Sequence, residues 1–245
     1  MENDARIQLA TEAQAFGLSL SDEQFDLLLA HLALVIKKNE VLNLTRIVDE
    51  HDAVTKHLVD SLLFHVALQD ADCPRGRFLD LGTGAGFPGI PFAIVSGRPG
   101  LLIDSVGKKA SAVQEFIDEL GLSDKLSAQA VRVESLAKQQ RGQFSCVTAR
   151  AVAELNVLIE YAAPLLRRDG VLIASKGRLS DEELENASYA ATMCGMEAVS
   201  RETFELPNEA GHRDIAIYRK VDHPQISLPR AVGAAKHKPL ICPAS

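Results

Sequence analysis

Residues 80–89 read Asp-Leu-Gly-Thr-Gly-Ala-Gly-Phe-Pro-Gly, and this stretch decides the fold class. The short apolar run 78–81 has the character of a buried strand, and the glycines that follow permit a sharp turn and a close approach of a ligand to the backbone. Pro88 suits the first turn of a helix. A strand, a glycine turn and a helix in this order are typical of the first unit of a nucleotide-binding α/β sheet.

Short apolar runs and helical stretches alternate along the chain after this turn. We expect helices over 109–120, where Gly121 ends the pattern, and over 154–168, where Asp169-Gly170 ends it. The strands that the apolar runs predict are 78–81, 101–103, 127–131, 144–148, 171–174, 196–199 and 214–218. This alternation predicts an α/β fold with a doubly wound, mostly parallel, seven-stranded Rossmann-like sheet.

The two ends of the chain differ from this pattern. Ser21 can cap a helix whose apolar residues recur at helical spacing from Phe25 to Ile36, and a second helix is expected over 50–68. The last residues lack periodicity and contain several prolines, which favours an extended arm. We therefore predict an N-terminal helical region (1–72), a sheet domain (73–222) and a C-terminal arm (223–245).

Composition restricts the class of protein. A chain of 245 residues with 47% hydrophobic content can bury one sizeable core. An acidic start without a following apolar run predicts no secretory signal, and no stretch approaches the roughly 18–20 apolar residues of a membrane span. We expect a cytoplasmic monomer. The four cysteines are far apart without a CxxC pair, so we expect neither a zinc site nor a disulfide framework.

Charge is distributed unevenly along the chain. The net charge of −7 argues against a protein that coats nucleic acid, because phosphate binding depends mostly on cations. However, residues 223–245 contain no Asp or Glu and carry Arg230, Lys236 and Lys238. This basic segment is a candidate for local phosphate contact.

The spacing of the glycines distinguishes between two classes of cofactor. Dinucleotides favour G-x-G-x-x-G, and Gly84, Gly86 and Gly89 do not match that pattern. Gly82, Gly84 and Gly86 instead give G-x-G-x-G after the strand acid Asp80. S-adenosylmethionine has no phosphate but has a cationic amine and a sulfonium, so an acid beside a glycine turn suits it better. The alternative is a tight turn that binds no ligand.

Polar residues follow the neighbouring strands as well. Asp104 lies about 20 residues after the glycine turn, the interval at which an acid meets ribose hydroxyls in nucleoside-binding sheets. Val133 and Glu134 follow the third strand, where an adenine edge would lie. For the carboxylates of Asp104 and Glu134, the alternative is a surface role without a ligand.

Two cations end later strands of the predicted sheet. Arg150 ends the fourth strand and Lys176 ends the fifth. An arginine fork at the ligand edge of a sheet suits phosphate or carboxylate, and a surface ion pair is the alternative for each residue.

Several motifs together resemble the bacterial small-subunit ribosomal RNA methyltransferase G family, also called glucose-inhibited division protein B. The resemblance covers nearly the whole chain. It is carried by residues 43–45 with 57–61, by the glycine stretch continued as Gly-Ile-Pro through residue 91, by 104–109 and by 148–151. Residues 229–230 and 236–240 look like the basic tail of many members.

The resemblance implies an enzyme that transfers a methyl group from S-adenosylmethionine to N7 of a guanine in 16S ribosomal RNA, free or in the ribosomal subunit. It implies loop contacts from Gly82 and Phe87, and adenosine contacts from Val133 and Glu134. Arg150 matches a motif arginine near the cofactor. Arg132 and Arg213 are candidates for RNA contact. Guanine N7 carries a lone pair and no proton, so we expect no general base, and Arg150 is the candidate for positioning.

Three alternatives differ in class. A methyltransferase of the same fold could act on a small molecule or a protein, which the acidic net charge favours. An NAD-linked oxidoreductase is opposed by the glycine spacing. A nucleotide-sensing RNA-binding module without turnover is compatible with the residues, because the expected reaction needs no nucleophile or base.

Overall fold

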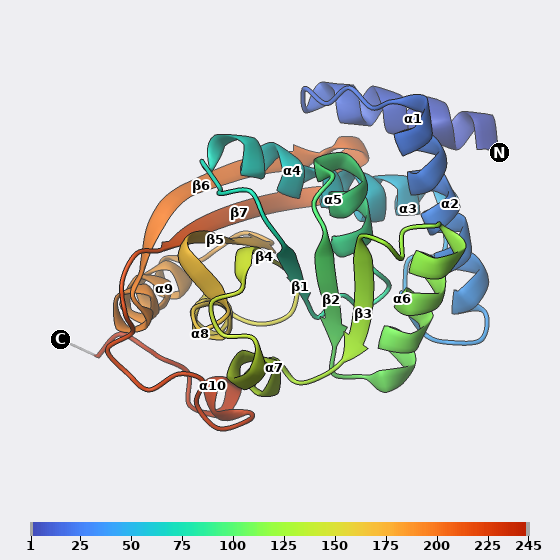
Figure 1. Ribbon diagram of the computed structural model, residues 1–245. Coiled ribbons are helices and arrows are strands. Elements are labelled where there is room, and N and C mark those ends of the chain that lie inside the picture. Colours follow the sequence, from blue (N-terminus) through green and yellow to red (C-terminus); the bar gives the residue numbers. More distant parts are fainter. Residues whose placement is uncertain (1, 244–245) are drawn as a thin grey trace.

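A computed structural model describes residues 2–243, and within them seven strands form one sheet in the order β3-β2-β1-β4-β5-β7-β6 (Figure 1). The strands are β1 Phe78–Leu81, β2 Gly100–Asp104, β3 Leu126–Ala130, β4 Phe144–Arg150, β5 Leu166–Lys176, β6 Met196–Leu206 and β7 Gly211–Lys220. Strands β1 to β5 are parallel, and β7 pairs antiparallel with both β5 and β6. The predicted mostly parallel, seven-stranded Rossmann-like sheet is therefore confirmed.

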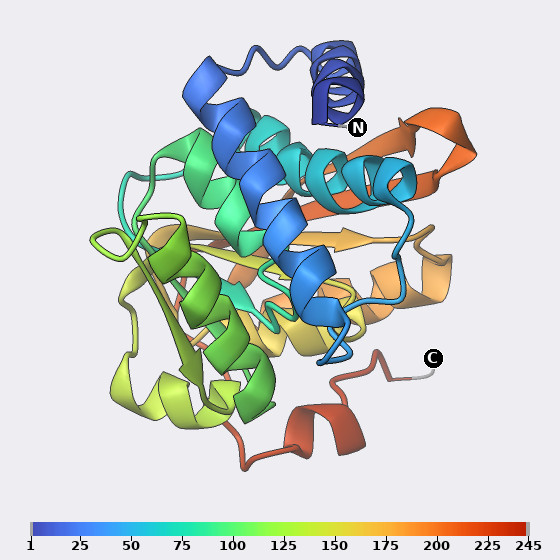
Figure 2. The same cartoon turned by 90° about the vertical axis from the view of Figure 1, so that its right-hand side faces the viewer.

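Helices cover both faces of this sheet (Figures 1 and 2). The helices of one face are α1 Glu2–Ala15, α2 Asp22–Asn39, α3 Glu50–Ala53, the π-helix η1 Val54–Val59, α4 Asp60–Asp70, α5 Gly89–Ser96 and α6 Gly107–Glu119. On the other face lie α7 Val133–Gln139, α8 Leu155–Ala162, α9 Asp181–Cys194 and α10 Ala234–His237, and the short 3-10 helix η2 Pro207–Glu209 joins β6 to β7. None of the helices in residues 2–243 combines the length and apolar character needed to cross a membrane.

Alternation along the strands divides the interior into two cores. Phe78 faces the core beneath α2, α4 and α5, whereas its neighbour Leu79 faces the core beneath α8 and α9. The N-terminal helices share the first of these cores with the sheet, because Leu28 and Leu58 belong to the same cluster as Phe78. The N-terminal helical region therefore packs directly against the sheet that carries the site. Its first residue, Met1, lies outside the described residues.

The α2 helix begins as its sequence predicts. Ser21 accepts a hydrogen bond from the backbone N–H of Gln24, and the Gln24 side chain accepts one from the backbone N–H of Ser21. This reciprocal capping box satisfies two backbone donors that would otherwise lack a partner.

Two predicted boundaries are wrong. The helix expected over 154–168 ends at Ala162, because Pro164 has no backbone N–H to continue the helical hydrogen bonds, and β5 already begins at Leu166. The third strand ends at Ala130, one residue before its predicted end, and Val133 and Glu134, which follow it as expected, lie in the first turn of α7.

The predicted extended C-terminal arm is also wrong for the residues that the structure describes; residues 244–245 lie outside them. Gly233 adopts a φ of +82° and opens the short helix α10, and the chain around it packs onto the sheet domain. Leu228 and Ala235 are buried in the second core. Apolar residues at scattered positions hold this segment against the protein in spite of its prolines.

Candidate active site

The strand order reverses at β1, which lies between β2 and β4, and the carboxyl ends of these strands meet there. Ligands of doubly wound sheets bind at this switch point. The glycine turn leaves β1 at the same edge, with Gly82 at φ +69° and Gly84 at φ +59°. Left-handed backbone of this kind is readily adopted by glycine alone, which explains why the turn is built from glycines.

Asp80 supports the turn from behind. Its buried carboxylate accepts hydrogen bonds from the Thr148 hydroxyl at 2.8 Å and from the Gly89 backbone N–H at 3.1 Å. Burial raises the pKa of Asp80 to about 6, and the hydrogen bonds oppose this shift. Through these hydrogen bonds, Asp80 ties β1, β4 and the start of α5 together.

Asp104 holds the other side of the turn. One carboxylate oxygen accepts the Gly84 N–H at 3.1 Å and the other accepts the Val106 N–H at 2.8 Å. The side chain also borders a cavity at the ends of β1 and β2. Asp104 is therefore fixed in orientation with part of its surface available to a ligand.

This cavity, which we call the β1–β2 cavity, has a volume of about 80 Å³. Its lining residues are Leu81, Gly82, Ile103, Asp104, Ser105, Val131, Arg132, Val133, Glu134, Val152, Tyr161 and Lys236. The structure thus brings together Gly82, Asp104, Val133 and Glu134 from the predicted cofactor set. The other predicted members are absent from this lining. Gly84, Phe87 and Asp80 lie in or behind the turn, and Arg150 lines a second cavity at the end of β4.

Glu134 has a partner within the protein that the sequence does not indicate. Its buried carboxylate accepts a hydrogen bond from the backbone N–H of Gly233 in the C-terminal segment at 2.8 Å. Burial, with the nearby charge of Glu134, raises the pKa of Tyr161 to about 12, so this phenol stays protonated. The cavity wall therefore combines an acid, a phenol and the C-terminal segment.

A second cavity, the β4–β5 cavity, lies at the ends of β4 and β5 and has a volume of about 660 Å³. Its lining residues are Ile47, Lys56, His57, Asp60, Arg150, Ala151, Val152, Ala153, Ser175, Lys176, Gly177 and Arg213. Val152 belongs to both cavities, so they meet at one wall. Three predicted cations, Arg150, Lys176 and Arg213, are gathered here.

Asp60 organises two of these cations. Its buried carboxylate accepts a hydrogen bond from Arg150 at 3.1 Å and one from Arg213 at 2.9 Å. Arg150 also donates to the Lys56 carbonyl at 3.1 Å. Several guanidinium N–H groups are thereby fixed, and the two forks are held side by side at the cavity.

A column of rings lies beside the arginines. His57 stacks on Phe87 with ring centroids 4.6 Å apart, and the guanidinium of Arg150 lies 5.5 Å from the centroid of Phe87. Burial, and then the charge of Arg150, lowers the pKa of His57 to about 3, so the imidazole is neutral at physiological pH. His31 packs against Phe87 at 4.5 Å. Phe87 therefore supports the basic cavity from beneath.

Sequence reasoning missed His57 and Asp60 as site residues, although both lie within the 57–61 stretch that carries the family resemblance. The available signal was the presence of polar residues, among them Thr55, His57 and Asp60, between the apolar residues Val54, Leu58 and Leu62 of this helix. The structure shows a π-helix over Val54–Val59 at this point, which is a form found frequently at functional sites.

The other predicted RNA-contact residues do not form one patch. Lys176 pairs with Glu183 at 2.9 Å, and Arg230 forms an ion pair with the buried Glu160. Arg132 and Lys236 border the β1–β2 cavity, and Lys238 is exposed on the C-terminal segment. The described residues contain no group of three or more His, Cys, Asp or Glu side chains that could hold a metal ion.

The sheet order and a ligand edge at β1 and β4 define the class of a Rossmann-like methyltransferase fold. A geranyl diphosphate methyltransferase in complex with S-adenosylmethionine aligns with a TM-score of 0.54 and 10% identity, over 70% of this chain and 90% of that one. The cyclase SpnF aligns with a TM-score of 0.55 and 15% identity, over 66% of this chain and 82% of that one. At such low identities the likeness shows the fold alone.

Sequence comparison gives the particular family. Residues 24–212 match the family model described as rRNA small subunit methyltransferase G. A protein of that name from Carboxydothermus hydrogenoformans is 37% identical over 95% of this chain and 99% of its own length. One from Deinococcus radiodurans is 42% identical over 93% of this chain and 90% of its own length. The chain belongs to the rRNA small subunit methyltransferase G family, as the resemblance predicted.

Proposed function

We propose that this protein is an S-adenosylmethionine-dependent methyltransferase that methylates N7 of a guanine in small-subunit (16S) ribosomal RNA. The observation that carries the proposal is the shared wall at Val152, where a small cavity lined by two carboxylates meets a larger cavity that holds Arg150, Arg213 and Lys176. A methyl donor in the first and a nucleotide in the second would have adjoining reactive ends. Family membership supports small-subunit ribosomal RNA as the substrate, because the relatives are named as methyltransferases of that RNA.

The β1–β2 cavity fits the nucleoside end of the cofactor. Asp104, Val133 and Glu134 line this cavity, and this supports our assignment of Asp104 to the ribose hydroxyls and of the first turn of α7 to the adenine edge. Gly82 makes room there, since a Cβ added to it would lie 2.8 Å from Val152 Cγ2. When bound, S-adenosylmethionine supplies a methyl group on an activated sulfonium.

The β4–β5 cavity fits a nucleotide. The neutral imidazole of His57 and the planar forks of Arg150 and Arg213 offer flat surfaces and donors for a purine and its phosphates. Guanine O6 can accept a hydrogen bond from an arginine, while N7 must stay free because its lone pair is the nucleophile. No residue has to remove a proton before attack. The residues of this cavity therefore orient the base and exclude water.

Positioning is then the main contribution of the protein to catalysis. Alignment of two reactants can lower a barrier by about 7–11 kcal/mol without an acid or base. We assign this role to Arg150, which Asp60 and the Lys56 carbonyl hold in place. Arg132, Arg213, Lys176 and Lys238 lie at or outside the cavity edges as candidates for phosphate contact.

The test is methyl transfer from labelled S-adenosylmethionine to small-subunit ribosomal RNA and to assembled small subunits, with mass spectrometry of the nucleosides. We expect 7-methylguanosine at one site, and RNA affinity that falls steeply with salt, because phosphate contacts release counterions. Labelling of proteins or metabolites without RNA would support the same-fold alternative. Labelling of another atom of the base would contradict the assignment of N7.

A further inference from the structure

The C-terminal segment 224–242 runs along the side of the sheet domain that carries α7 and α8 (Figures 1 and 2). Its helix α10 packs against α8. Lys236, on this helix, borders the β1–β2 cavity together with Asp104 and Glu134. A segment distant in sequence from the glycine turn therefore forms part of the cavity wall.

Two acids of the sheet domain hold the segment on either side of the bend before α10. The Arg230 guanidinium donates Nε to Glu160 Oε1 at 2.7 Å and Nη2 to the other oxygen of the same carboxylate. The backbone N–H of Gly233 donates to Glu134 Oε1 at 2.8 Å. Glu160 and Glu134 are both buried, so each carboxylate depends on these donors for compensation of its charge.

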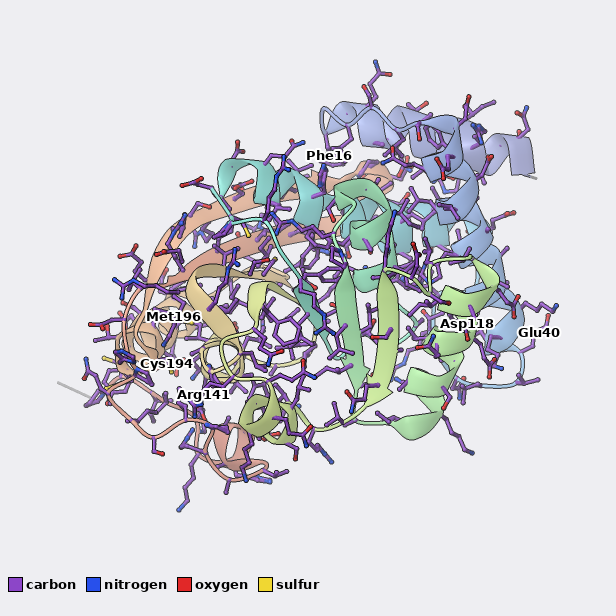
Figure 3. The ribbon with its side chains drawn as sticks, viewed as in Figure 1. Phe16, Glu40, Asp118, Arg141, Cys194 and Met196 are labelled. Atoms are coloured by element: carbon purple, nitrogen blue, oxygen red, sulfur yellow. The ribbon has the colours of Figure 1, made fainter. Side chains whose placement is uncertain are left out.

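Further contacts fix the segment beyond α10 and before it. Asn156 donates its side-chain amide to the Leu240 carbonyl at 2.8 Å, and the Cys242 N–H donates to Asn186 Oδ1 at 2.9 Å. Arg141, which Figure 3 labels beside this segment, donates to the Leu228 carbonyl. Ala235 is 1% exposed. The segment is thus docked at several points along its length.

These contacts determine which basic residues of the segment can contact a ligand. A guanidinium with a bidentate carboxylate partner has fewer donors left for phosphate. Arg230 is therefore occupied by Glu160, whereas the exposed Lys236 extends beside the cavity, where its ammonium can donate to ribose oxygens or to a ring nitrogen.

We propose that the segment 224–242 is a wall of the cofactor pocket, docked by Arg230 and Gly233 and contacting the bound cofactor through Lys236. It sets affinity for the cofactor, and neither Arg230 nor Lys236 acts as a contact for RNA. This inference rests on S-adenosylmethionine being the ligand of the β1–β2 cavity.

The experiment measures S-adenosylmethionine binding by isothermal titration calorimetry for the parent, Arg230→Gln, Lys236→Ala and His237→Ala. We expect Arg230→Gln and Lys236→Ala each to weaken binding about tenfold. His237→Ala is the matched control on the same helix, since His237 is exposed and outside the cavity lining, and we expect it to bind like the parent. Thermal unfolding without ligand identifies any variant that fails to fold, and Lys236→Ala removes no docking contact.

A second measurement separates a wall from an arm. Filter binding of small-subunit ribosomal RNA at saturating cofactor should give the same affinity and salt dependence for Arg230→Gln as for the parent. If both variants bind the cofactor like the parent, or if only RNA affinity is lost, the proposal that the segment is a wall of the cofactor pocket is wrong. A parent that binds no S-adenosylmethionine overturns the proposed function, and the wall with it.

Discussion

The two cavities that meet at Val152 are built in different ways. The β1–β2 cavity has a volume of about 80 Å³ and is enclosed by strand ends, the first turn of α7 and the C-terminal segment. The β4–β5 cavity has a volume of about 660 Å³ and gathers Arg150, Arg213 and Lys176. A nucleotide that remains attached to a polymer needs space for the base and cations for its phosphates. The larger β4–β5 cavity, lined by three of the predicted cations, therefore suits a nucleotide of an RNA chain.

The cavities also differ in which part of the chain supplies them. The sheet domain and the C-terminal segment supply the first, whereas the second depends on His57 and Asp60 from the N-terminal helices. Phe87 joins the two, because it belongs to the glycine turn and stacks beneath His57. If this division is functional, variants of one cavity should change cofactor binding and variants of the other should change turnover.

The largest effect is expected from Arg150→Ala. Loss of the fork should lower kcat for methyl transfer about 100-fold, because small misplacement of a reactant is enough for a loss of that size. Affinity for S-adenosylmethionine should stay within about threefold, since Arg150 does not line the β1–β2 cavity. Steady-state kinetics and calorimetry give the two values.

Arg150→Lys is the control for charge alone. It keeps the cation and loses the planar fork, so we expect a value of kcat between those of the parent and Arg150→Ala. A variant Arg150→Ala with parent-like kcat and weakened cofactor binding would show that the arginine serves the other cavity.

Asp104→Ala tests the β1–β2 side. The variant loses the acceptor for the Gly84 and Val106 N–H groups and the candidate acceptor for ribose. We expect KM for S-adenosylmethionine to rise about 30-fold, as for loss of hydrogen bonds to a charged group, with kcat at saturation nearly unchanged. Asp104→Asn keeps one acceptor oxygen and should be intermediate. A fall in kcat at unchanged KM would contradict the assignment of this cavity to the cofactor.

The same contrast explains what the sequence could predict. Gly82, Asp104 and Val133 follow successive strands, and parallel strands bring their carboxyl ends to one edge, so their proximity follows from the fold class. Asp60 meets Arg150 across 90 positions of sequence, through helices that carry no motif of that chemistry. Local pattern contains no information on such a contact.

For the C-terminal segment, the sequence pattern predicted a structure that the protein does not have. Its prolines and missing periodicity indicated an exposed arm, but the partners of Arg230 and Gly233 are acids of α8 and α7 far away in the sequence. Burial of Leu228 and Ala235 against the second core offsets the loss of chain freedom. A tertiary contact here overrides composition.

A pH-dependent prediction concerns the histidine beneath the glycine turn. His31 donates Nε2–H to the Ala85 carbonyl at 3.1 Å, its Nδ1 is buried without a partner, and burial lowers its pKa to about 4. The folded state therefore binds fewer protons than the unfolded state between about pH 6.5 and 4, so stability falls as pH falls through that window. From pH 7 to pH 5 we expect His31 to account for a loss of about 2 kcal/mol.

His31→Gln isolates this contribution, because glutamine can keep the donor to Ala85 and does not titrate. Urea unfolding of parent and variant at both pH values should show the variant losing less stability on acidification. The raised pKa of Asp80 acts in the opposite direction and is common to both proteins, so it largely cancels in the difference. Equal losses would show that His31 does not stay neutral beneath the turn.

The smallest expected effect compares two glycines of the same turn. Alanine at Gly82 or at Gly84 would carry a similar left-handed strain of about 1–2 kcal/mol, because their φ values are +69° and +59°. The space around them differs, since a Cβ on Gly82 would lie 2.8 Å from Val152 Cγ2, whereas one on Gly84 would meet nothing closer than the Gly82 carbonyl at 4.0 Å. In the absence of ligand, Gly82→Ala should therefore lower the melting temperature more than Gly84→Ala, because Val152 must move to make room. Gly82→Ala should push Val152 out of the shared wall and weaken cofactor binding about tenfold more than Gly84→Ala. If both variants weaken binding equally, strain in the turn is sufficient to explain the loss, and the wall at Val152 does not separate two functional cavities.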